Sequence, residues 1–90
     1  MPSIFIPTMM RKYTDDERSV EVAGNSVAEA LQALEARYPR ASSQLYDEKG
    51  ELKSFIAIFV NDTDIRLLSG KETPLRESDE VHIIPAIAGG

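Results

Sequence analysis

The residues with the clearest chemical potential stand at the end of the sequence, in Ala88-Gly89-Gly90. Glycine has no side chain, so a Gly-Gly segment can take almost any backbone conformation and pass through a narrow channel in a partner protein. The one reactive group on such an end is the α-carboxylate of Gly90. An ordinary frayed terminus is the alternative interpretation, because chain ends are generally poorly ordered.

The residues before this end indicate how it is presented. The run Glu80–Ile84 predicts a final strand because β-branched residues dominate it. Pro85 has no amide proton to donate, so strand pairing is expected to stop there. We therefore predict one folded domain over residues 1–85 and a flexible tail over residues 86–90. The tail residues expected to thread a partner's active site are Ile87, Ala88 and Gly89.

Length and charge limit the classes of partner. A chain of 90 residues is expected to form a single domain. Its formal charge of -5 disfavours nucleic acids and anionic membranes as partners. Basic partner surfaces are favoured, although a merely solvated acidic surface explains the charge equally well. No apolar run is long enough for a membrane span or a signal peptide, so a cytoplasmic protein is expected.

The sequence has no cysteine and a single histidine. The missing thiol excludes disulfides, iron–sulfur clusters, thiolate zinc sites and a persulfide carried on the protein's own side chain. His82 lies in the middle of a predicted strand, where it is expected to face solvent or a neighbour rather than to activate a nucleophile. We therefore expect no bound metal or cofactor and no enzymatic activity in its own right.

The first half of the sequence predicts a hairpin followed by a helix. Ser3–Ile6 and Ser19–Val22 read as strands joined by a long polar loop, and the second strand alternates polar and apolar residues. Ser26-Val27-Ala28-Glu29 fits a capping box. Apolar residues then recur at helical spacing, which predicts a helix near Val27–Tyr38 that Pro39 ends.

The second half predicts further short elements. A short helical turn is expected around Ala41–Leu45 and a tight turn at Asp47–Gly50. Phe55–Val60 is the strongest strand, and Thr63–Leu68 is expected to return as a short one. One helix can cover only one face of the resulting sheet, so the sequence predicts an α+β fold with the other face open.

The strand residues divide into two sets by alternation. The set predicted to face the helix comprises Ile4, Ile6, Ile56, Ile58, Val60, Val81 and Ile83. The opposite set comprises Phe5, Phe55, Phe59 and Ile84, with His82 among them. Several large apolar side chains on an open face indicate a partner-docking surface around Phe5, Phe59 and Ile84. Ordinary strand propensity is the alternative explanation.

This order of elements, with the Gly-Gly end, resembles the ubiquitin-like (β-grasp) sulfur carriers over essentially the whole chain. That family includes the thiamin-pathway carrier, the small subunit of molybdopterin synthase and the carrier that feeds cysteine synthesis. The segments that carry the resemblance are Ile6-Pro7-Thr8, Leu34-Glu35-Ala36-Arg37-Tyr38-Pro39, Val60-Asn61-Asp62, Ser78-Asp79-Glu80-Val81-His82-Ile83-Ile84-Pro85 and Ala88-Gly89-Gly90. Ile6-Pro7-Thr8, Val60-Asn61-Asp62 and the ending Ala86-Ile87-Ala88-Gly89-Gly90 look closest to the carrier that feeds cysteine synthesis. Pro85-Ala86 stands where the molybdopterin branch often has two prolines.

The resemblance implies a β-grasp fold, a mixed sheet with one main helix, and a working residue at Gly90. A partner E1-like adenylating enzyme would use ATP to activate the Gly90 carboxylate, and sulfur would then convert it to a thiocarboxylate. The expected sulfur acceptor is a pyridoxal-phosphate cysteine synthase. Three alternatives remain open: a molybdopterin synthase small subunit, a ubiquitin-like modifier joined to protein lysines, and a binding module whose tail is idle.

Overall fold

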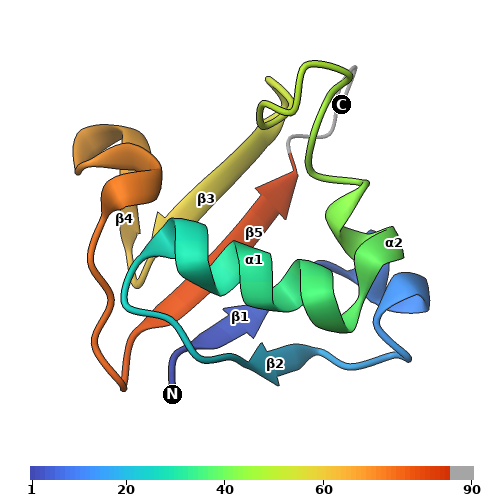
Figure 1. The fold of residues 1–90 in the computed structure, drawn as a ribbon, viewed down its shortest axis with the longest axis horizontal. Helices are drawn as coiled ribbons and strands as arrows, with labels where there is room; N and C mark the ends of the chain where they lie inside the picture. The colour runs from blue at the N-terminus through green and yellow to red at the C-terminus, as the bar shows by residue number, and fades with distance from the viewer. Residues whose placement is uncertain (86–90) are drawn as a thin grey trace.

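Five strands form one mixed sheet in the computed structural model, which describes residues 1–85 (Figure 1). The strands are β1 (Ser3–Phe5), β2 (Ser19–Glu21), β3 (Ile56–Val60), β4 (Thr63–Asp64) and β5 (Glu80–Pro85). Their order across the sheet is β2-β1-β5-β3-β4. β1 and β5 run parallel, and the other neighbouring pairs are antiparallel. The last strand therefore lies beside the first and inside the sheet.

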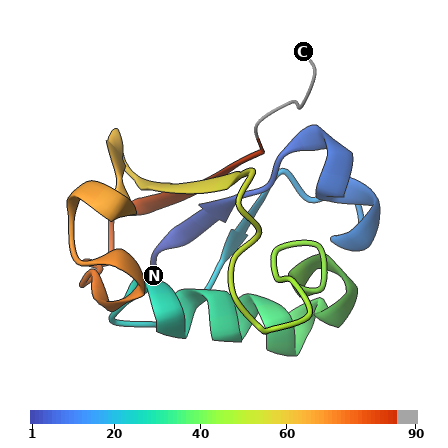
Figure 2. The same cartoon turned by 90° about the horizontal axis from the view of Figure 1, so that it is seen from above.

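The two α-helices lie on one side of this sheet (Figures 1 and 2). They are α1 (Val27–Arg37) and α2 (Pro39–Ser42). Short 3₁₀ helices occupy the connections: η1 (Thr8–Tyr13), η2 (Ile65–Leu67) and η3 (Gly70–Glu72). Neither α-helix covers the other face of the sheet. The predicted α+β arrangement, one main helix on one face of a mixed sheet, is confirmed.

The start of α1 follows the capping pattern in the sequence. The Ser26 Oγ accepts a hydrogen bond from the Glu29 N–H at 3.2 Å. The Glu29 Oε1 in return accepts from the N–H of Asn25 at 2.8 Å, one residue before the cap. One amide that the helix leaves unpaired, that of Glu29, is thus satisfied, and so is the amide of Asn25 just outside the helix.

The end of α1 comes one residue before the predicted Tyr38. Tyr38 leaves the helical conformation, with φ of -135° and ψ of 76°, as expected for the residue before a proline. Pro39 then takes the first position of α2, where its missing N–H costs nothing. The helical turn predicted at Ala41–Leu45 is therefore present as α2, but it begins two residues earlier and ends at Ser42.

Several predicted strand bounds were too long. Phe55 lies in a turn before β3, because the Ile56 N–H donates to the Lys53 carbonyl at 3.0 Å. The return strand predicted within Thr63–Leu68 is limited to Thr63–Asp64, since Asp64 caps η2 by accepting from the Arg66 N–H at 2.8 Å. The final strand was predicted one residue too short: strand pairing was expected to stop at Pro85, but Pro85 belongs to β5 and stands opposite Ile56.

The long loop between β1 and β2 contains η1, which the sequence did not predict. Met10 supplies its one buried side chain. Thr14 follows it and is fully buried, with its hydroxyl donating to the carbonyls of Arg11 (3.3 Å) or Glu17 (3.1 Å). Asp15 and Asp16 then turn the chain with φ of 52° and 64°, a conformation that aspartate tolerates better than most residues.

The core lies between the sheet and α1. The set predicted to face the helix is confirmed: six of the seven side chains are buried and Ile56 packs against them in part. From α1 the core receives Val27, Ala30, Leu31 and Leu34. Gly24, just before the helix, packs backbone against backbone: a Cβ placed there would lie 2.9 Å from the Ala30 nitrogen. The close approach of the β2–α1 connection therefore requires glycine.

Candidate functional site

Three rings form a row across the open face of the sheet. Phe5 on β1 pairs with His82 on β5, and His82 in turn pairs with Phe59 on β3. The rings of Phe5 and His82 stack with centroids 4.6 Å apart and planes 13° from parallel. The row joins residues that are far apart in the sequence into one surface.

Ile84 extends this surface along β5 towards Pro85. It is the next residue of β5 on the same face, opposite Ala57, and 45% of it is exposed. Phe5 and Phe59 are half-buried. The structure thus brings together Phe5, Phe59 and Ile84 as the sequence predicted, whereas Phe55 stands before the strand, in the turn. We call the surface formed by Phe5, Phe59, His82 and Ile84 the open-face patch.

His82 lies at the centre of the open-face patch. Sequence reasoning placed it on this face but assigned it no particular role. Its Nε2 lies 3.1 Å from Glu80 Oε1, two residues earlier on the same strand, so the pair carries opposite charges only when the imidazole is protonated. Stacking against Phe5 and contact with Glu80 hold the ring between the two phenylalanines. The sequence placed these residues on one face, but their contact depends on the pairing of β1, β5 and β3.

Two shallow hollows flank β5 on this face. One, of about 350 Å³, lies between β1 and β5, with Phe5, His82, Ile84 and two arginines, Arg11 and Arg18, among its lining residues. The other, of about 300 Å³, lies towards the β3–β4 turn and is lined by Phe59, Asn61, Asp62, His82 and Ile84. Hollows of this form suit side chains that project from another protein better than a small ligand that must be enclosed.

The β3–β4 turn is fixed to the start of β5. Asn61 has a φ of 55°, and its Nδ2 donates to Asp79 Oδ1 at 3.2 Å while its Oδ1 accepts from the Glu80 N–H at 3.1 Å. The Arg76 N–H donates to Asp79 Oδ2 at 2.8 Å. This backbone hydrogen bond, followed by that from Asn61, holds the pKa of the Asp79 carboxyl below its ordinary value.

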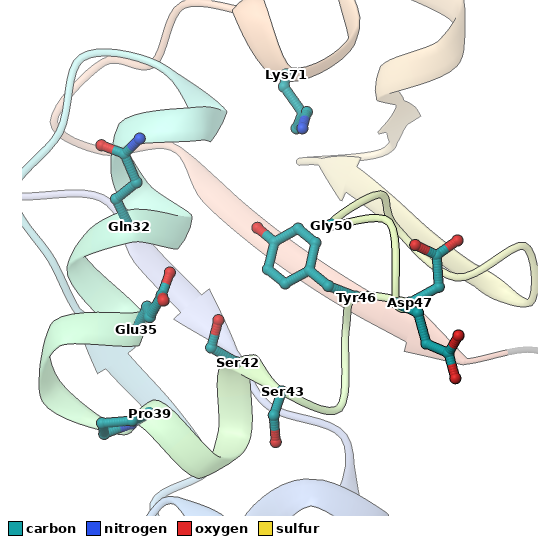
Figure 3. Close-up of a pocket in the computed structure, with 10 residues that line it drawn as sticks. Gln32, Glu35, Pro39, Ser42, Ser43, Tyr46, Asp47, Gly50 and Lys71 are labelled. Carbon is teal, nitrogen blue, oxygen red and sulfur yellow. The ribbon is translucent and has the colours of Figure 1, made fainter.

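A wider groove, of about 670 Å³, lies on the helix side of the sheet (Figure 3). Gln32 and Glu35 of α1 line it together with Tyr46 and Lys71. Burial raises the pKa of the Tyr46 hydroxyl, and the charge of Glu35 raises it further, so this phenol stays neutral at neutral pH. The groove is lined by hydroxyls, carboxylates and one amine.

Residues 1–85 contain no group of three or more potential metal ligands of the His, Cys, Asp or Glu type. Within the same residues, no helix has both the length and the apolar character needed to cross a membrane. The predicted threading residues Ile87, Ala88 and Gly89, and the predicted working residue Gly90, lie outside the described residues.

The topology defines the class of protein. A mixed sheet with parallel first and last strands in its interior and one main helix across one face is the ubiquitin-like β-grasp fold. The sequence model of the ThiS family matches residues 4–90, and the chain belongs to that family. The resemblance to ubiquitin-like sulfur carriers is thereby confirmed.

Individual relatives agree with this assignment. The sulfur carrier protein CysO of Mycobacterium tuberculosis is 38% identical over 90 residues, which cover 98% of this chain and 97% of the relative. A chain in the crystal structure of the Amycolatopsis orientalis BexX/CysO complex superposes with a TM-score of 0.90 at 37% identity, with all of both chains covered. The small archaeal modifier protein 1 of Methanosarcina acetivorans superposes with a TM-score of 0.83 at 30% identity, over 99% of this chain and 95% of that one.

The Asp79 carboxylate should make part of the stability depend on acid pH. A carboxyl whose pKa is lowered by folding adds stability above its unfolded pKa, and loses it as the pH falls through the folded pKa. Asp79→Asn should therefore lower the free energy of unfolding at pH 7 by about 1 kcal/mol or less, since Asp79 is only partly buried. It should also weaken the loss of stability below pH about 4.

Urea unfolding of the wild type and of Asp79→Asn at neutral and acid pH measures both effects. Some acid sensitivity should remain in the variant, because hydrogen bonds from Arg66 also lower the pKa of Asp64. Identical pH dependence in the two proteins would show that Asp79 does not contribute.

Proposed function

We propose that this protein is a sulfur carrier that delivers sulfur from a thiocarboxylate at Gly90, for the biosynthesis of cysteine. Gly90 is the C-terminal residue in this proposal. The observation that carries it is membership of the ThiS family together with similarity to the sulfur carrier protein CysO over nearly the full length of both chains. The protein is then the substrate of its partners rather than a catalyst.

The chemistry requires a partner enzyme because a carboxylate is a poor acceptor for nucleophiles. In the proposed first step, the Gly90 carboxylate attacks the α-phosphorus of ATP, pyrophosphate leaves and an acyl-adenylate forms. Sulfide, or a persulfide on the partner, then attacks the acyl carbon, and AMP leaves. A persulfide donor must finally have its S–S bond cleaved by a thiol. The product is a thiocarboxylate, which is anionic and nucleophilic.

The absence of cysteine fits a protein that is acted on by a catalytic partner. The chain has no cysteine, so sulfur has to be held on the terminal carboxyl carbon rather than on a side chain. The E1-like enzyme supplies ATP binding and catalysis, and the carrier supplies recognition and reach. No cofactor needs to be bound by the carrier itself.

The open-face patch is the surface we propose for docking the activating enzyme. It is centred on β5, the strand that leads directly into residues 86–90, so a partner bound there is close to the point where the tail begins. Apolar side chains that are half-exposed at a fixed position can be buried on binding with little loss of conformational entropy. Docking on this surface would therefore deliver the tail in a defined direction.

A second candidate function is that of a ubiquitin-like modifier, in which the adenylated Gly90 is joined to a protein lysine. Similarity to the small archaeal modifier protein 1 of Methanosarcina acetivorans supports it. Both functions share the activation step. They differ in the final acceptor, which is a sulfur-accepting enzyme in one and a lysine amine in the other.

Activation should depend on Gly90. With its E1-like enzyme, ATP and a sulfur donor, the protein should gain the mass difference between one sulfur and one oxygen atom, as measured by intact-mass spectrometry. Deleting Gly90 should abolish this gain and leave the melting temperature unchanged. Adding one residue after Gly90 should also block it, because a displacement of about 1 Å can cost ~100-fold in rate. A mass gain that survives deletion of Gly90 would contradict the proposal.

The open-face patch should contribute to binding the activating enzyme. Phe59→Asp is expected to weaken the complex by about 2 kcal/mol or more, because it places a charge where an aromatic side chain is buried on binding. Leu67→Asp is the matched control: Leu67 is 80% exposed and lines neither hollow of the open face. Calorimetry measures the affinities, and circular dichroism confirms that both variants fold. Equal affinity of the two variants for the activating enzyme would show that the open-face patch is not part of the interface.

The acceptor should be a pyridoxal-phosphate cysteine synthase. When the thiocarboxylated protein is mixed with this enzyme and an activated serine, the thiocarboxylate sulfur should displace the serine leaving group. Peptide mass spectrometry should then find a cysteine adduct at Gly90. Protein with an unmodified carboxylate is the control. A stable complex with a molybdopterin synthase large subunit, with no cysteine adduct, would favour the molybdopterin branch instead.

A further inference from the structure

The two sides of the open-face patch carry opposite charge. Arg11 and Arg18 line the hollow on the β1 side, and no aspartate or glutamate does. Asp62 lines the hollow on the β3–β4 side, and no lysine or arginine does. His82 and Ile84 line both hollows, so the apolar patch lies between a basic flank and an acidic one.

The basic flank is held in place and is free to bind. Arg11 is fixed beside the hollow, because its Nε donates to the Ile6 carbonyl at 3.1 Å. Arg18 is exposed, and its main-chain carbonyl accepts from the Ile6 N–H at 2.8 Å. Among residues 1–85, neither guanidinium pairs with a carboxylate; Arg66 pairs with Asp64, and the other close contact of this kind, His82–Glu80, is an ion pair only when the imidazole is protonated.

Most lysines and arginines of residues 1–85 form no ion pair, and Arg11 and Arg18 are distinguished from the others by their place beside the open-face patch. A guanidinium group binds carboxylates through two parallel hydrogen bonds, which fixes direction as well as adding attraction. Apolar contacts alone do not fix how a docked partner is rotated about the axis perpendicular to the sheet. A basic flank on one side of the patch and an acidic flank on the other do fix this rotation.

We propose that Arg11 and Arg18 bind carboxylate side chains of the activating enzyme, and so fix the orientation in which it docks. This inference rests on the proposed function and specifies the partner surface. That surface has an apolar ridge for the open-face patch, acidic side chains over the β1 flank and a basic side chain opposite Asp62. Charge complementarity of this kind selects the partner and its register more than it adds total affinity.

Steady-state adenylation tests the inference, with the E1-like enzyme that activates the wild-type protein as the probe and pyrophosphate release as the readout. Arg18→Glu should raise the KM for the carrier by about tenfold or more, because it opposes like charges across the interface. The kcat should stay within about twofold, since the docked tail reaches the same catalytic groups. Arg18→Gln should give an intermediate KM, and Arg18→Lys a KM between those of the wild type and Arg18→Gln, because lysine keeps the charge but not the two parallel hydrogen bonds.

Lys71→Glu is the matched control. It changes the net charge by the same amount but lies at the groove on the helix side of the sheet (Figure 3). Its KM should remain close to that of the wild type. Circular dichroism verifies that each variant folds. If Arg18→Glu disturbs the loop before β2, the KM of Arg18→Gln decides whether the basic flank contributes to docking.

Different results would contradict the proposed function and the role of the two arginines in docking. If no E1-like enzyme adenylates the wild-type protein, the proposed function is wrong. If the wild type is adenylated but Arg18→Glu and Arg18→Gln show the same KM as Lys71→Glu, the basic flank has no part in docking and the further inference is wrong. A fall in kcat with unchanged KM would overturn it as well, because the effect would then lie after docking.

Discussion

The parallel pairing of β1 with β5 is the constraint on which the rest of the structure depends. A tight turn cannot join parallel strands, so the chain must cross from one to the other through a long connection. Here that connection contains α1, which covers one face of the sheet and supplies the apolar side chains that bury β1 and β5 from that side. The last strand consequently lies in the interior of the sheet, where both its neighbours hold it.

The same pairing also creates the surface that the proposed function uses. Phe5, His82 and Phe59 meet only because β1, β5 and β3 are adjacent in that order. Because both α-helices lie on one side of the sheet (Figure 2), the other face remains open along β5, the strand that precedes residues 86–90. In the proposed function, a partner enzyme binds the domain through the apolar patch beside β5. The oppositely charged flanks then set the direction in which residues 86–90 enter the partner.

Much of this fold could be predicted from the sequence because its signals are local. Alternation along Ile56–Val60 and Val81–Ile84 assigned the two faces correctly, and the Ser26–Glu29 pattern located the start of α1. Helix η1 was missed, because six residues with one buried side chain show no periodicity. Phe55 was placed in the strand on propensity alone, whereas a turn hydrogen bond to Lys53 delays β3 by one residue.

The candidate site was only partly predictable for a different reason. Phe5, Phe59 and Ile84 could be assigned to one face, but their contact through His82 depends on strand order. The charged flanks depend on it even more, since Arg11 and Arg18 reach the face from a 3₁₀ helix and a loop. The match to the ThiS family model includes residues 86–90, which follow β5 in the sequence.

The most direct test of the central claim is the intact mass of the protein isolated from its own cells under conditions that demand cysteine. The account predicts a population in which sulfur replaces one oxygen at the C-terminal carboxyl of Gly90, and in which alkylation adds a single label there. A population carrying only the unmodified carboxylate, or only conjugates to lysines of other proteins, would contradict it.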